Sequence, residues 1–207
     1  MTYDRDEILN LFENTIFKDS EGFFTEGETF NVLDSNPILW KDFIEYSGAT
    51  RFVLVPKDKT KNFAIKIPYN NCAFSPCSYC FWDYCGAELE RYNIAEEEGL
   101  EKYFAKIEFV GYSAKEKYPI YVQEKCVMGI DTNSKHSLEE IKKTHSLSPY
   151  RGIQSEWLTD FRLAYGEEEF FKFIYFIQNK EWDDDLYYNV GYLHGLPIVV
   201  DYASYNE

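Results

Sequence analysis

The 207-residue chain has no apolar run of the roughly 18–20 residues that a membrane-spanning helix requires. Its first residues, Met1 to Asp6, are polar and acidic, so no secretory signal peptide is expected. Internal repeats and low-complexity segments are also missing, and glycine and proline are sparse at 11 and 7 copies. These absences predict a globular cytoplasmic protein that does not bind membranes.

Several catalytic motifs are missing as well. The sequence has no Gly-x-Ser-x-Gly and no His-Glu-x-x-His, which argues against a serine hydrolase and a zinc protease. The three histidines, His136, His145 and His194, are scattered and form no metal-binding or nucleophile pattern.

Basic residues are few. The chain carries 21 Lys and Arg against 36 Asp and Glu, a net charge of −15. That balance disfavours direct binding to nucleic acid. It has two explanations: solubility, or a surface that imitates the phosphate backbone and occupies a basic nucleic-acid-binding protein.

Apolar periodicity predicts an α+β fold, because helices and strands do not alternate regularly along the chain. The predicted helices cover residues 4–16, 37–46, 88–99, 156–165 and 167–179, with a further one near 137–144. The predicted strands pair as hairpins or neighbours and cover 51–56, 62–67, 107–112, 120–125, 190–193 and 198–201.

One lysine stands on an apolar strand after a predicted hairpin, in Phe63-Ala64-Ile65-Lys66-Ile67. The helix that follows offers Glu88 as its ion-pair partner, with Glu90 as an alternative. A lysine in this setting is a candidate for holding phosphate groups.

A second pattern occurs near the end of the sequence. Asp184 precedes Asn189 by five residues, and Asp201 ends the apolar strand Pro-Ile-Val-Val. Phosphoryl transfer uses a carboxylate that orients the attacking hydroxyl and acidic or amide side chains that hold a metal ion.

Together these segments resemble protein kinases, in their V-A-I-K strand, their Asp-x-x-x-x-Asn pattern and the Asp of D-F-G. The resemblance covers roughly residues 46–125 and 167–203 and is nearest to short, atypical kinase-like proteins of phage and bacterial genomes. It implies that Lys66 holds ATP phosphates and pairs with Glu88. Asp184 would then be the catalytic carboxylate, and Asn189 and Asp201 would bind Mg²⁺. Gln123, Glu124 and Lys125 would form a hinge whose backbone reads adenine.

The resemblance also implies a domain plan. Residues 1–47 would form a helical extension. Residues 48–125 would form a kinase-like N-lobe, an antiparallel sheet plus one helix, with a cysteine-rich insertion at 70–85. Residues 126–207 would form a reduced helical C-lobe that is truncated after the metal-binding Asp.

Departures from the kinase pattern leave activity open. Ser47-Gly48-Ala49-Thr50 stands where the glycine-rich loop belongs, and Trp182-Asp183 replaces His-Arg before the catalytic Asp. The aspartates at 183–185 make that assignment uncertain by one residue. The chain is therefore either an atypical phosphotransferase using ATP and Mg²⁺, or an inactive acidic inhibitor that blocks a basic nucleic-acid-binding partner.

Four of the five cysteines, Cys72, Cys77, Cys80 and Cys85, follow the spacing C-x4-C-x2-C-x4-C. Four thiolates can close a tetrahedral zinc site. Aromatic neighbours indicate the alternative that these thiols are buried as small apolar groups. Cys126 is predicted to lie in the core.

Overall fold

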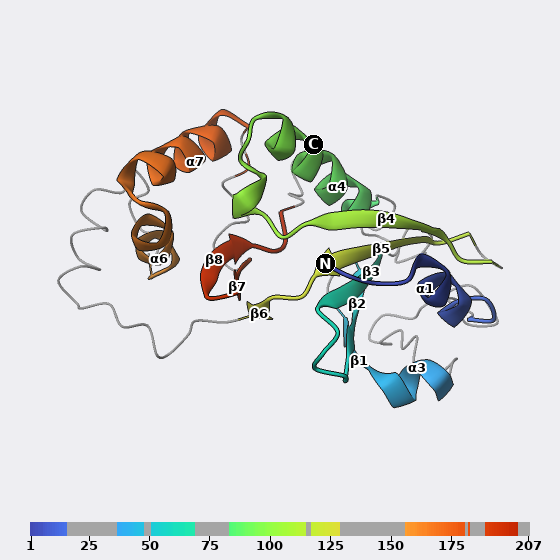
Figure 1. The fold of residues 1–207 in the computed structure, drawn as a ribbon. Coiled ribbons are helices and arrows are strands. Elements are labelled where there is room, and N and C mark those ends of the chain that lie inside the picture. The colour runs from blue at the N-terminus through green and yellow to red at the C-terminus, as the bar shows by residue number, and fades with distance from the viewer. Residues whose placement is uncertain are drawn as a thin grey trace, which may run out of the picture. The chain divides into compact units, whose positions relative to one another are not determined.

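The computed structural model describes residues 1–15, 37–47, 51–68, 83–114, 117–128, 156–180, 182 and 189–202 (Figure 1). The chain divides into two compact units. The first contains residues 1–93 and 106–125, and the second contains 94–105 and 126–206.

A five-stranded antiparallel sheet is the centre of the first unit as described. The strand order is β1-β2-β3-β5-β4, so β1 and β4 form the edges. The strands are β1 (Phe43–Ser47), β2 (Arg51–Pro56), β3 (Phe63–Pro68), β4 (Ile107–Tyr112) and β5 (Pro119–Glu124). This arrangement confirms the mixed α+β class with an antiparallel sheet.

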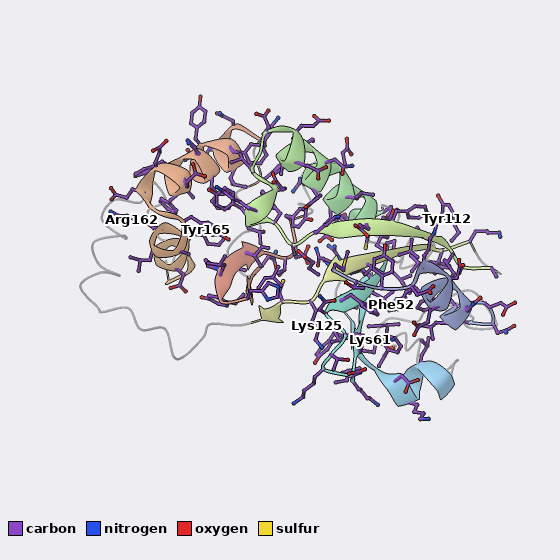
Figure 2. The ribbon with its side chains drawn as sticks, in the orientation of Figure 1. Phe52, Lys61, Tyr112, Lys125, Arg162 and Tyr165 are labelled. Atoms are coloured by element: carbon purple, nitrogen blue, oxygen red, sulfur yellow. The ribbon has the colours of Figure 1, made fainter. Side chains whose placement is uncertain are left out.

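One face of this sheet packs on an apolar core together with helices α1 (Arg5–Leu11) and α3 (Pro37–Asp42). Phe52 of β2, labelled in Figure 2, is 1% exposed and lies in this core. The other fully or nearly buried members include Ile8, Phe12, Leu39, Leu54, Ile65, Ile67, Val110, Ile120 and Val122. Burial of so many aliphatic and aromatic side chains is the main source of stability for this unit.

Gly111 allows α1 to approach strand β4 closely. Its φ is +157°, and a Cβ there would lie 3.0 Å from Leu9 Cδ2. The register between β4 and β5 also shifts between Phe109 and Gly111, as at a β-bulge.

The opposite sheet face carries several polar side chains. Side chains of paired strand residues share a face, and Lys66 pairs with both Val53 and Tyr121. Helix α4 (Tyr84–Glu97) contributes hydrogen-bond partners on this face. The Tyr121 hydroxyl donates to the Asp83 carboxylate directly before α4, and Lys66 donates to Glu88 on the helix.

The second unit contains a three-stranded sheet in the order β6-β7-β8 within the described ranges. Its elements are the 3-10 helix η2 (Glu101–Tyr103), β6 (Val127–Met128), α6 (Glu156–Tyr165), α7 (Glu167–Asn179), β7 (Val190–Leu193) and β8 (Leu196–Val199). Its rings pack edge to face or stacked, as for Phe161 on Phe173 and Phe104 on Trp182.

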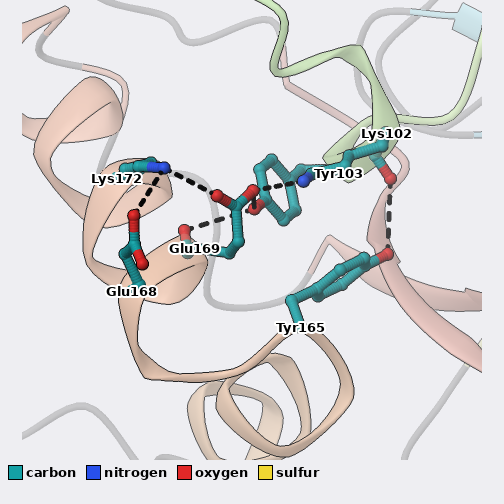
Figure 3. Close-up of polar contacts among 6 residues, drawn as sticks. All are labelled: Lys102, Tyr103, Tyr165, Glu168, Glu169 and Lys172. Carbon is teal, nitrogen blue, oxygen red and sulfur yellow. Dashed lines mark hydrogen bonds and ion pairs between the residues drawn. The ribbon is translucent and has the colours of Figure 1, made fainter.

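A polar network joins η2 to α7 within the second unit (Figure 3). Glu169 on α7 accepts hydrogen bonds from Lys102, from the Tyr103 hydroxyl at 3.0 Å and from Lys172 at 2.8 Å. The Tyr165 hydroxyl donates to the Lys102 carbonyl at 3.3 Å. These bonds lower the pKa of Glu169 to about 2, with the one from Lys102 as the largest cause.

The structure confirms the strands 51–56 and 107–112 and the helices 156–165 and 167–179. The helix predicted over 37–46 is wrong in its second half, because α3 ends at Asp42 and β1 begins at Phe43. The alternation of buried Phe43 with exposed Ile44 follows a strand period there. The helix near 137–144 lies outside the described residues.

Helix α4 starts at Tyr84, four residues before the predicted start, because Asp83 caps it. The Asp83 carboxylate accepts from the Gly86 N–H at 2.8 Å, which satisfies a free donor of the first turn. In the parts of the chain that the structure describes, no helix is long and apolar enough to cross a membrane.

Candidate functional site

A buried ionic cluster joins two strands and a helix on the polar face of the first unit's sheet. Glu88 of α4 is 0% exposed, and its two oxygens lie 3.0 and 2.8 Å from Lys66 Nζ on β3. Arg51 of β2 places its Nη1 2.6 Å from Glu88 Oε1. Both cations are 5% exposed, so the cluster is shielded from water.

The ion pair expected between Lys66 and Glu88 is therefore present, whereas Arg51 was not predicted. Arg51 opens the apolar strand Arg-Phe-Val-Leu-Val, where a charged first residue looks like a strand end. Strand residues two positions apart share a sheet face, so Arg51 lies on the same face as Val53 and its partner Lys66. This two-residue spacing was the sequence signal that could have identified Arg51.

The hinge predicted at residues 123–125 lies at the end of β5. The N–H of Glu124 donates to the Lys106 carbonyl at 2.9 Å, and the N–H of Lys125 donates to the Asn62 carbonyl at 3.0 Å. These two N–H groups are thus not available to an adenine base, and the adenine-binding role stays a prediction.

Gln123 differs from its two neighbours. Its side chain is 3% exposed, and within the described structure its Nε2 has no hydrogen-bond acceptor. Gln123 pairs with Ala64, two residues from Lys66 on β3, so its side chain shares the face of the ionic cluster. Sequence reasoning assigned a role to its backbone and missed the buried amide.

The two predicted metal ligands of the second unit, Asn189 and Asp201, lie at one end of the β7–β8 hairpin. Val190 pairs with Val199, and the Val200 N–H donates to the Asn189 carbonyl at 2.7 Å. Asn189 therefore stands opposite the residue that precedes Asp201. Asp184 lies outside the described residues.

Carboxylate and carboxamide oxygens are the donors that Mg²⁺ takes in proteins, so Asn189 and Asp201 have suitable chemistry for it. Among the residues that the structure describes, no group of three or more His, Cys, Asp or Glu could hold a metal ion.

Of the four clustered cysteines, Cys85 alone is described. It lies in the first turn of α4, fully buried, and desolvation raises the pKa of its thiol. The positive charge of Arg51 acts in the other direction and is the smaller effect. Cys72, Cys77 and Cys80 lie outside the described residues, so the zinc site stays a prediction. Cys126 is partly exposed and packs against a small apolar cluster of the second unit.

The described chain is thus a mixed α+β protein with a buried lysine–glutamate pair on its larger sheet. No protein-family model and no curated protein matches it. A solved structure to which it is similar is the Legionella pneumophila Lpg2603 kinase bound to IP6. The similarity has a TM-score of 0.31 and 14% identity, covering 93% of this chain and 65% of that one.

Proposed function

We propose that this chain is a kinase-like protein that binds a nucleoside triphosphate together with Mg²⁺. The observation that carries the proposal is the buried Lys66–Glu88 pair, which links the strand after a hairpin to the following helix. A lysine fixed in this way can present its ammonium group to phosphate oxygens.

The Mg²⁺ part of the proposal is supported by two residues of the second unit. Asn189 and Asp201 come from the two chain segments that meet at one end of the β7–β8 hairpin, and both offer oxygen ligands. Phosphoryl transfer further needs a carboxylate that orients the hydroxyl, and the resemblance to protein kinases implies that role for Asp184. We therefore propose that the chain binds nucleotide, and the proposal does not extend to catalysis.

Thermal unfolding with and without ATP and Mg²⁺ tests the proposal. Ligand at about 100 times its Kd stabilises the folded state by about 2.7 kcal/mol. For a chain of this size, that gain raises Tm by roughly 5–10 °C. Lys66→Met should abolish the rise, and the variant should still fold because Arg51 remains paired with Glu88.

Lys61→Met is the matched control, since Lys61 lies in the turn before β3 and pairs with Glu7 at the surface. This variant should keep the full nucleotide-dependent rise. Asp201→Asn should remove the part of the rise that depends on Mg²⁺. If millimolar ATP and Mg²⁺ leave the Tm of the wild-type protein unchanged, the proposal fails and the acidic inhibitor becomes the better hypothesis.

A further inference from the structure

The start of helix α4 is tied to the polar face of the first unit's sheet at two points. Lys66 on β3 donates to Glu88, and the Tyr121 hydroxyl on β5 donates to Asp83. Lys66 and Tyr121 are cross-strand partners on adjacent strands. Two neighbouring side chains of the sheet therefore contact the chain both directly before α4 and one turn into the helix.

The contact at Asp83 also determines how the helix begins. One Asp83 oxygen accepts from the Gly86 N–H at 2.8 Å, and the other accepts from the Tyr121 hydroxyl. A Cβ on Gly86 would lie 3.0 Å from Asp83 Oδ2 and 3.1 Å from the Tyr121 hydroxyl oxygen. Both distances are tighter than ordinary van der Waals contact, so glycine gives the helix cap and the tyrosine hydroxyl room to meet.

Glu88 stands two residues after Gly86 in the same helix, so a movement of the first turn of α4 also moves its carboxylate. We propose that Tyr121 is a positioning residue for nucleotide binding: through Asp83 it holds the first turn of α4, which keeps Glu88 in place to pair with Lys66. This inference rests on the proposed function for the identity of the ligand. Tyr121 acts through the helix and does not itself touch the nucleotide.

The dissociation constant for ATP with Mg²⁺ tests this role. Tyr121→Phe removes the hydroxyl and keeps the ring. A first turn that holds its position for a smaller fraction of the time lowers the apparent affinity by that fraction, so the variant should bind about three-fold more weakly or worse. Tyr112→Phe is the matched control, because Tyr112 lies on the neighbouring strand β4 and is 59% exposed. It should bind like the wild type.

A second variant reaches the same hydrogen bond from the helix. Gly86→Ala places a methyl group against Asp83 and Tyr121, and it should weaken ATP binding by a similar factor. Because both changes disturb one contact, the double variant should bind about as weakly as the weaker single variant. Independent effects would multiply to about nine-fold or more and would overturn the proposal.

Amide hydrogen exchange without nucleotide tests the positioning independently of the ligand. The Gly86 N–H donates to the Asp83 side chain, and the Ala87 N–H donates to the Asp83 carbonyl. In Tyr121→Phe both N–H groups should exchange faster, by a larger factor than the N–H groups of strand β3. An equal change in the helix and the strand would contradict the inference.

The outcomes separate this inference from the proposed function. A lower Tm of Tyr121→Phe at unchanged ATP affinity would show a merely structural role and would overturn the inference alone. Absence of ATP binding by the wild type would instead contradict the proposed function.

Discussion

At the scale of residues, the side-chain amide of Gln123 is buried, and its N–H donor has no acceptor among the residues that the structure describes. Replacing it with methionine, which has a similar length, removes an unsatisfied polar group. Gln123→Met should therefore raise the free energy of unfolding by about 1 kcal/mol. Urea denaturation measures this change. Gln178→Met on the exposed side of α7 is the control and should leave stability within about 0.5 kcal/mol of the wild type.

A loss of stability in Gln123→Met, with no change in the control, would show that the amide has a partner in solution.

Individual residues also show where sequence reasoning succeeds. Lys66 was found because a lysine inside an apolar strand breaks the local pattern, and Glu88 because the resemblance to protein kinases implies an acidic partner on the next helix. Arg51 and Gln123 were missed because their burial depends on which strands become neighbours, a non-local property.

At the scale of elements, sequence periodicity predicted most helices and strands of the described chain but not every boundary. The helices α6 and α7 were predictable because their apolar residues recur with helical spacing. Strand β1 was missed because Ile38, Leu39, Phe43 and Ile44 also fit a helix, and pairing with β2 decides the outcome. The start of α4 depends on the cap at Asp83, which lies outside the apolar pattern.

The bonds that tie η2 to α7 make this pair of elements sensitive to acid. The pKa of Glu169 falls from 4.5 to about 2 in the folded protein, so the folded state favours the ionised carboxylate. Its contribution to stability is present above pH 4.5 and is lost as pH falls toward 2. The Tm difference between wild type and Glu169→Gln should therefore shrink over this range.

Thermal unfolding at intervals between pH 6 and pH 2.5 measures that difference. Glu168→Gln is the control, because Glu168 is exposed and contacts Lys172 without reaching Lys102 or Tyr103. This variant should keep the acid sensitivity of the wild type, because the contacts of Glu169 with Lys102 and Tyr103 remain. A constant gap between wild type and Glu169→Gln would mean that the network does not form.

At the scale of the whole molecule, the net charge of −15 is the dominant property. Charge of one sign opposes the compact state through self-repulsion. The buried Arg51–Glu88–Lys66 cluster is little affected by salt, while surface pairs such as Lys61–Glu7 contribute only about 0–1 kcal/mol each. Added salt should therefore weaken the repulsion among the excess negative charges more than it weakens the surface ion pairs.

Raising NaCl from 10 to 200 mM should accordingly increase Tm by roughly 2–4 °C, equivalent to about 1 kcal/mol. The acidic run Glu96, Glu97 and Glu98 at the end of α4 contributes to the repulsion, since negative charge at a helix C-terminus also opposes the helix dipole. Replacing all three with glutamine should raise Tm at low salt and reduce the salt-dependent increase. A Tm that falls with added salt would mean that favourable ion pairs, rather than repulsion, govern the electrostatics of this chain.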